Sequence, residues 1–368
     1  MPQRLKASLA PAVKRVDAPR AAKPATPQAS QFPSTAHDVA RLAGVSQSAV
    51  SRCFTPGASV SDAMRQRVQQ AADTLGYRPN LIARSLIKRE STIIGVVLPD
   101  LDNPFYASVV GRLSSMLTET GRRILLFRSP ATDSSDPVLE DVLRYRVDGL
   151  ILVSSPLSST FADECVRIGL PVVQLNRTSM RARVSSVVGD NVRGAARIAE
   201  HLLRHGHRRL AYVAGQDGSS TSQERENGFT AALRQAGLTL ALRETGHYTQ
   251  DGARAATQRL LSLPEPPDAI FFANDYMALA GLSVARHAFG ADIGRSLSIV
   301  GFDDIPMAAW PEFSLATFRQ PIDAMCARTV EIIQAQLGDI GVAPQRLVLP
   351  GELVVRGSVR GGVVDPLA

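Results

Sequence analysis

The sequence predicts an all-α segment near the N-terminus and a larger α/β core with parallel sheets. Residues 35–75 carry three short amphipathic helical patterns separated by turn signals. From Thr92 onward, apolar β-branched runs alternate with helical stretches, which is typical of parallel strands covered on both faces. The length of 368 residues also exceeds the size at which a single hydrophobic core stops growing.

Positive charge is concentrated at the N-terminal end of the chain. Residues 1–33 carry six basic side chains and one acidic one, and residues 34–88 carry seven and three, while the whole chain has a net charge of +7. The remainder is therefore slightly acidic. Basic surface attracts the phosphate backbone of DNA, although a chance surplus of solvated charges is the alternative. Residues 1–33 are rich in Ala and Pro without a hydrophobic period, and we expect a disordered basic arm.

The first helix is predicted to begin after Thr35. Thr35 and Asp38 form a capping-box-like pair, and Val39 and Leu42 then lie on one helical face. Gly44 follows this helix and can take the positive φ that a tight turn requires.

Two further helices complete a predicted helix-turn-helix. Ser46 can cap a short helix from about Gln47 to Phe54, and Ser61 can cap a third helix that ends at Gly76. Such an arrangement places its second helix in the DNA major groove, whereas an ordinary three-helix subdomain would leave the same polar side chains in solvent. Gln can pair with adenine, Arg with guanine, and Ser or Ala can touch a thymine methyl group. The predicted DNA contacts of this helix are Ser46, Gln47, Ser48, Ala49, Ser51 and Arg52.

The string DVARLAGVSQSAVSR resembles the signature of the LacI/GalR family of repressors, roughly D-V-A-x-x-A-G-V-S-x-x-T-V-S-R. Ala49 replaces the usual Thr, and Cys53-Phe54-Thr55 replaces an aliphatic pair followed by Asn. The next string, GYRPNLIARSL, resembles the hinge helix of that family. A helix of about two turns is marginal alone and needs a partner. The resemblance implies that two such helices pair in the minor groove with Leu86 as a wedge. The DNA contacts that it implies are Asn80, Ala83, Arg84, Ser85 and Leu86.

Parallel strands are predicted at several apolar runs of the core. They read TIIGVVLP, RILLF, DGLILVSS, PVVQLN, SSVVGD, RLAYVAG, DAIFFAND and LSIVGFDD, and nearly all end in polar residues. Ligands bind beyond the carboxyl ends of parallel strands. The candidate ligand contacts at these strand ends are Asp100, Ser155, Asn176, Asp190, Asn274 and Asp303.

The family resemblance extends from residue 34 to about 358, with VDGLIL, GHRRLAYVAG, FFANDYMALAG and SIVGFDD as landmarks. It implies a periplasmic-binding-protein-like core, in which two similar subdomains are joined by crossovers that we expect near residues 190, 318 and 340. It also implies effector contacts. These are Phe105, Tyr106, Ser219, Thr221, Arg225, Tyr248, Asn274, Asp303 and Gln320. Such a set of arginine, carboxamides, aspartate and aromatics suits a small polyhydroxylated or carboxylated ligand.

No motif supports a catalytic site, a metal site or a cofactor. The pattern Glu200-His201 with His205 is E-H-x-x-x-H rather than H-E-x-x-H, and the three cysteines form no CxxC pair. The chain contains no Walker A motif, no G-x-S-x-G elbow and no GxGxxG after the first strand. We therefore expect no catalytic residues, no metal ligands and no cofactor.

These observations predict a cytoplasmic DNA-binding transcriptional regulator, a repressor by resemblance, controlled by a sugar or sugar acid. We expect a homodimer on double-stranded operator DNA, and no membrane partner, because no apolar run reaches the roughly 18 residues of a membrane span. A transport-type ligand-binding protein is the alternative and an enzyme ranks third, but the string LKASLAPAV is too short and interrupted for a secretory signal. The predicted domains are residues 1–33 (arm), 34–78 (helix-turn-helix), 79–91 (hinge helix and linker), 92–360 (core) and 361–368 (tail).

Overall fold

The computed structural model describes residues 34–55, 57–79, 90–99, 101–129, 136–156, 158–179 and 184–362. The chain divides into two compact units, Met1–Arg84 and Ser85–Ala368. The predicted arm, and the hinge residues Asn80, Ala83, Arg84, Ser85 and Leu86, lie outside the described residues.

The first unit contains three helices, α1 (Ala36–Ala43), α2 (Gln47–Cys53) and α3 (Asp62–Leu75), within its described residues. They enclose one small core around Val39, Val50 and Val68, each fully buried. Such a core follows from the three-and-four spacing of apolar residues in short helices, because that spacing gives each helix one apolar face.

The helix ends largely follow the predicted capping pattern. Thr35 and Asp38 form a reciprocal capping box, and Gly44 takes a φ of 64°. Two expectations were wrong. The face that Val39 and Leu42 were predicted to share is not buried as a whole, because Val39 is fully buried and Leu42 is 54% exposed. Ser61 occupies the N-cap position of α3 without a side-chain hydrogen bond to the helix.

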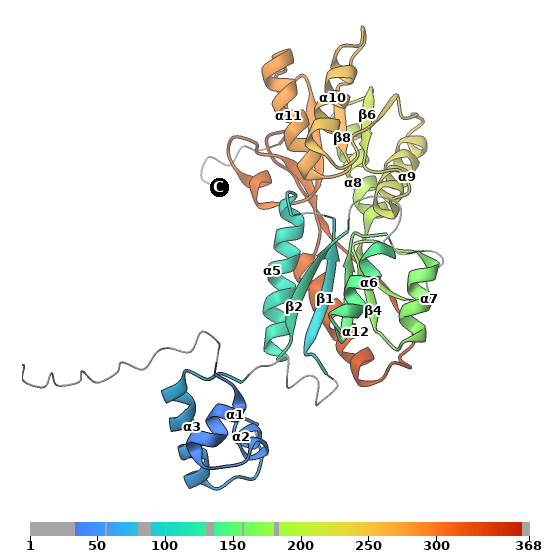
Figure 1. Ribbon diagram of the computed structural model, residues 1–368. Coiled ribbons are helices and arrows are strands. Elements are labelled where there is room, and N and C mark those ends of the chain that lie inside the picture. Colours follow the sequence, from blue (N-terminus) through green and yellow to red (C-terminus); the bar gives the residue numbers. More distant parts are fainter. Residues whose placement is uncertain are drawn as a thin grey trace, which may run out of the picture. The chain divides into compact units, whose positions relative to one another are not determined.

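The second unit consists of two α/β subdomains, each built on a six-stranded sheet (Figure 1). The sheet of the amino-terminal subdomain has the order β11-β5-β4-β3-β1-β2 and is parallel throughout. Its strands are β1 (Ile93–Leu98), β2 (Arg123–Arg128), β3 (Gly149–Val153), β4 (Val172–Leu175), β5 (Ser185–Gly189) and β11 (Arg346–Leu349). Its helices are α5 (Pro104–Glu119), α6 (Asp136–Arg144), α7 (Ser159–Arg167) and α12 (Ile322–Gly338).

The carboxyl-terminal subdomain repeats this plan with the order β12-β10-β9-β8-β6-β7. Only the β10–β12 pair is antiparallel among the described strands. The strands are β6 (Leu210–Ala214), β7 (Leu242–Thr245), β8 (Ala269–Phe272), β9 (Ser298–Asp303), β10 (Ala316–Arg319) and β12 (Glu352–Val354). The helices are α8 (Asn191–Arg204), α9 (Ser220–Gln235), α10 (Gln250–Leu261), α11 (Asp275–Phe289) and the 3-10 helix η1 (Pro306–Ala309).

The central strands are buried along their whole length, and this explains their apolar sequences. All residues of β3, β5, β6, β8 and β9 are buried, because helices cover both faces of each sheet. The predicted α/β class with parallel sheets is confirmed.

The chain passes between the two subdomains three times: at Asp190, between β10 and α12, and between β11 and β12. The third passage lies at Pro350–Gly351, farther along the chain than the expected position near residue 340.

Candidate functional site

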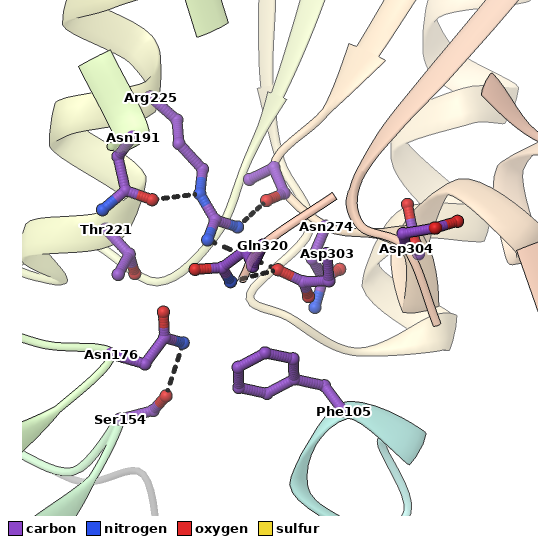
Figure 2. Close-up of polar contacts among 12 residues, drawn as sticks. Phe105, Ser154, Asn176, Asn191, Thr221, Arg225, Asn274, Asp303, Asp304 and Gln320 are labelled. Carbon is purple, nitrogen blue, oxygen red and sulfur yellow. Dashed lines mark hydrogen bonds and ion pairs between the residues drawn. The ribbon is translucent and has the colours of Figure 1, made fainter. Parts of the chain in front are cut away.

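A polar cavity lies where the carboxyl ends of the strands in the two subdomains face each other. It encloses about 740 Å³, including the part that is open to solvent. Figure 2 shows Phe105, Ser154 and Asn176 of the amino-terminal subdomain opposite a cluster around Arg225 of the carboxyl-terminal subdomain. The lining residues are Pro99, Asn103, Phe105, Tyr106, Ser154, Asn176, Arg177, Gln216, Ser219, Thr221, Arg225, His247, Tyr248, Thr249, Asn274 and Asp303.

Unusual backbone conformations gather around this cavity. Nine described non-glycine residues have a positive φ, and five of them line it, with φ values from 53° to 123°. They are Ser154, Asn176, His247, Tyr248 and Asp303. A positive φ is strained for a residue with a Cβ, and it persists only where the surrounding structure fixes it. Such clustering is typical of binding sites, in which side chains must be aimed at one point.

Arg225 is the centre of the polar cluster, and it comes from the second turn of α9. Its side chain is 2% exposed, its Nε donates to Asn191 Oδ1 at 2.9 Å, and its Nη1 donates to the Ala273 carbonyl (Figure 2). Nη2 lies 3.4 Å from Asp303 Oδ1, and the guanidinium carbon lies 3.7 Å above the Phe302 ring. These contacts fix the guanidinium in one orientation at the cavity wall.

Two buried carboxylates accompany this single arginine. Desolvation raises the pKa of Asp303 to about 6, although Arg225 and the hydrogen bond from Gln320 oppose the shift. Desolvation and the neighbouring Asp303 raise the pKa of Asp275 to about 7. Asp275 Oδ1 accepts a hydrogen bond from Thr317 Oγ1 at 2.6 Å. The buried cluster therefore holds no surplus of positive charge.

Some buried polar atoms at the cavity lack a hydrogen-bond partner. Within the described residues, Arg225 Nη2 and Asn176 Oδ1 make no hydrogen bond. Asn176 Nδ2 donates to Ser154 Oγ at 2.9 Å, so its amide oxygen remains available (Figure 2). Arg225 Nη2 has only its ion pair with Asp303 Oδ1 at 3.4 Å, so a ligand that accepts from Arg225 and donates to Asn176 would complete the hydrogen bonding of both side chains.

Aromatic side chains complete the wall of the cavity. Phe105 is 2% exposed and packs edge-on against Tyr106 at the start of α5. Tyr248 exchanges a hydrogen bond with Thr221 at 3.1 Å, and its ring lies so close to Gly215 that a Cβ there would overlap it. Aromatic faces beside hydrogen-bonding groups are the composition of a site for a small ring-shaped polar molecule.

The structure brings most of the residues selected from the sequence to this cavity, and it separates a few. Those in the lining are Phe105, Tyr106, Asn176, Ser219, Thr221, Arg225, Tyr248, Asn274 and Asp303. Ser155 is fully buried and donates to the Val153 carbonyl, while its neighbour Ser154 lines the cavity. Asp190 instead caps α8 through the Arg193 amide at 3.1 Å. Gln320 lies behind the wall, where Nε2 donates to Asp303 Oδ1 at 2.8 Å.

Sequence reasoning missed Asn191, Gln216, His247 and Asn103. Asn191 orients Arg225 and is 1% exposed. Its only sequence signal is a polar residue next to Asp190, and nothing marks it as buried. Gln216 directly follows the predicted strand RLAYVAG, so an extension of that strand end by one residue would have included it. His247 follows β7 (Leu242–Thr245), a strand that was not predicted.

The amino-terminal part of α2 is the candidate DNA-binding surface in the first unit. Ser46, Gln47, Ser48, Ser51 and Arg52 are all exposed. Ser46 also caps the helix, because its Oγ accepts a hydrogen bond from the Ala49 amide at 3.2 Å.

Ala49 is placed differently from the prediction. It is only 4% exposed, so its methyl group is buried within the first unit (the headpiece) rather than presented to DNA. We therefore remove Ala49 from the candidate base contacts.

Comparisons with known proteins agree with both parts of this description. Residues 35–80 match the model of bacterial regulatory proteins of the lacI family, and residues 199–359 match the periplasmic binding protein-like domain. The chain is 30% identical over 329 residues to the HTH-type transcriptional repressor CytR of Escherichia coli K12. The aligned region covers 89% of this chain and 96% of CytR. The chain belongs to the LacI family.

Solved structures of LacI-family proteins show the same fold. The lac repressor dimer bound to operator and an anti-inducer matches 89% of this chain and all of its own, with a TM-score of 0.78 and 26% identity. The regulator CelR in complex with cellobiose matches 88% of this chain and 99% of its own, with a TM-score of 0.67 and 30% identity. Within the described residues of this LacI-family chain, no helix is long and apolar enough to cross a membrane. The same residues contain no group of three or more His, Cys, Asp or Glu side chains suited to a metal ion.

Proposed function

We propose that this LacI-family transcriptional regulator is a repressor that binds a two-fold symmetric operator as a homodimer. Exposed Gln47, Ser48 and Arg52 at the amino-terminal part of α2 supply donors and acceptors for base edges in the major groove. One such helix spans too few base pairs for a unique site, so two copies related by symmetry are needed. The names of the relatives support repression, and a repressor acts on DNA in the cytoplasm, where we place the protein.

We further propose that the ligand is a small uncharged polyhydroxylated molecule. The observation that carries this proposal is the buried Arg225–Asp303 pair at 3.4 Å, because the charge of the arginine is already balanced. A ligand carboxylate would add a third anion beside Asp303 and Asp275, whose desolvation is already unfavourable. A hydroxyl can accept from Arg225 Nη2 and another can donate to Asn176 Oδ1, while the ring packs on Phe105 or Tyr248.

The proposed ligand class is narrower than the one predicted from the sequence, which included sugar acids. Relatives of this chain are named as transcriptional repressors and regulators, and we infer that the protein binds its ligand without chemical conversion.

A paired ligand screen tests the ligand class, and a selection experiment tests DNA binding. We expect thermal stabilisation of the full chain by an uncharged sugar or nucleoside, and none by the matched acid, as in galactose against galacturonate. Stabilisation by acids alone would contradict the proposed ligand class.

Selection of random duplexes on the full chain should yield an inverted repeat. An enriched site without two-fold symmetry would contradict the proposed dimer.

A further inference from the structure

One carboxylate joins the amino-terminal ends of β1 and β3, at the opposite end of the sheet from the cavity. Asp148 Oδ1 accepts hydrogen bonds from the Ser91 amide at 2.7 Å and from Ser91 Oγ at 2.9 Å. Asp148 Oδ2 accepts from the Thr92 amide at 2.8 Å and from Arg122 Nη1 at 2.9 Å. The side chain of Asp148 is only 12% exposed. We name the contacts of Asp148 with Ser91 and Thr92 the Asp148 clamp.

The backbone that the clamp holds is strained. Thr92 has a φ of 57°, and Arg146, two residues before Asp148, has a φ of 48°. A positive φ is a genuine outlier for a β-branched residue. Thr92 is exposed, so side-chain packing does not impose this conformation. The hydrogen bond from its amide to Asp148, together with that from the Arg123 amide to the Thr92 carbonyl at 2.9 Å, fixes it instead. These hydrogen bonds therefore hold the chain in one direction at Thr92, in a conformation that persists only where the surrounding structure fixes it.

The two strands that start at the clamp end at the cavity. Thr92 immediately precedes β1 and Pro99 immediately follows it, while Asp148 and Ser154 flank β3 in the same way. Both Pro99 and Ser154 line the cavity. The strands are paired in register from Ile94–Gly149 to Val97–Leu152. Two buried, hydrogen-bonded strands move as one body, so any displacement of the cavity wall is carried to the clamp.

We propose that Asp148 is a positioning residue that fixes the direction in which the chain leaves the core toward the helix-turn-helix. This inference rests on the proposed function. Residue 90 connects the clamp covalently to the preceding chain, which contains α1, α2 and α3. While Asp148 keeps its contacts with Ser91 and Thr92, residue 90 turns together with the amino-terminal subdomain. With the clamp open, Ser91 and Thr92 become two additional rotatable residues, which absorb the rotation and enlarge the set of conformations that must be ordered on DNA.

Four variants of the full chain test this role on an operator duplex obtained by selection with the wild type. Asp148→Asn places an amide donor against the Thr92 amide or Arg122 and breaks the clamp. Thr92→Pro opens the clamp from the other side, because proline has no N–H and cannot take a φ of 57°. Thr92→Gly is the matched control, because glycine takes that φ without strain. Arg122→Gln is the second control, because it removes an ion pair from Asp148 but leaves both contacts with the exiting chain.

We expect operator affinity to fall about tenfold or more in Asp148→Asn and Thr92→Pro, and to stay within about threefold of the wild type in both controls. Affinity for a random duplex should be unchanged in all four variants. A more flexible link between core and headpiece affects only binding that needs both copies of α2 in their half-sites at once. A merely structural role would lower both affinities together and would follow the melting temperature, including that of Arg122→Gln.

Wild-type operator affinity in either Asp148→Asn or Thr92→Pro would overturn the inference. A loss of affinity in proportion to the melting temperature across all four variants would also overturn it. If selection yields no duplex that the wild type binds, the proposed function fails, and the inference fails with it.

Discussion

Replacing Arg225 by Ala tests the electrostatic account of the cavity. Two unit charges 3.4 Å apart attract by about 5 kcal/mol at an effective dielectric constant of about 20. Removing one partner of a buried ion pair typically costs about 3–5 kcal/mol, because the other charge stays buried. The substitution also removes the hydrogen bonds to Asn191 and to the Ala273 carbonyl. We therefore expect the free energy of unfolding to fall by about 4 kcal/mol at pH 7.5.

The pH dependence of this variant distinguishes charge from packing. The pKa of Asp303 is raised to about 6 in the folded protein, mainly by desolvation, and Arg225 opposes that shift. Without Arg225 the folded pKa rises further above its unfolded value. The folded state then binds the extra proton as the pH falls through that higher pKa, and this binding stabilises it. The deficit of Arg225→Ala should therefore be smaller at pH 5.5 than at pH 7.5.

Urea unfolding followed by circular dichroism at both pH values measures this effect. The double variant Arg225→Ala with Asp303→Asn should be more stable at pH 7.5 than Arg225→Ala, because the unpaired charge is gone. Arg254→Ala is the surface control: its side chain is 50% exposed, and we expect a change below about 0.5 kcal/mol. A deficit below about 1 kcal/mol for Arg225→Ala at pH 7.5, or one that grows on acidification, would refute the reasoning.

Three further predictions concern the headpiece and one buried histidine. Arg52→Ala should weaken binding to the selected operator by about 1–3 kcal/mol and relax one base position per half-site, as measured by competition binding; an equal loss for Arg41→Ala on α1 would contradict it. Ser46→Ala should lower the free energy of unfolding of the headpiece by about 1 kcal/mol, while Ser61→Ala should leave it unchanged, because only Ser46 makes a side-chain cap; urea titration checks both, and equal losses would refute the distinction. Burial lowers the pKa of His201 to about 4, so the unfolded state binds more protons below the ordinary pKa of histidine, and the contribution of His201 to stability should fall by up to about 3 kcal/mol between pH 6.5 and 4, against the opposite contributions of Asp275 and Asp303; the stability of His201→Phe relative to the wild type should therefore rise over that range, and an unchanged difference in urea titration would contradict the assignment.

The fold could be predicted from local patterns because its strands are buried on both faces. β6 and β8 are continuous apolar runs that no solvent face interrupts, and the helices between them carry one apolar stripe each. The helix ends were predicted from Thr35 and Gly44, whose roles depend on nearest neighbours alone. The exposure of Leu42 was not predictable, because it depends on how α1 meets its neighbours rather than on its own period.

The candidate site was predictable as a region and less so residue by residue. The strand-end argument selected Asn176 and Asn274, which both line the cavity. It selected Ser155, the last residue of the string DGLILVSS, because the apolar run does not reveal the positive φ of 53° at Ser154. Asn191 was missed because burial of a polar residue in a first helical turn depends on Arg225, which lies 34 positions away. The partners of such residues exist only in the folded molecule.

Reciprocal coupling between ligand and operator is the most direct test of the account. The measurement is the Kd of the full chain for its selected operator duplex, titrated with the uncharged ligand found by thermal shift. The account predicts a saturable change in this Kd of about 5–150-fold, and an equal change in ligand affinity when operator is present. A ligand that occupies the cavity and leaves the operator Kd unchanged at saturation would contradict it.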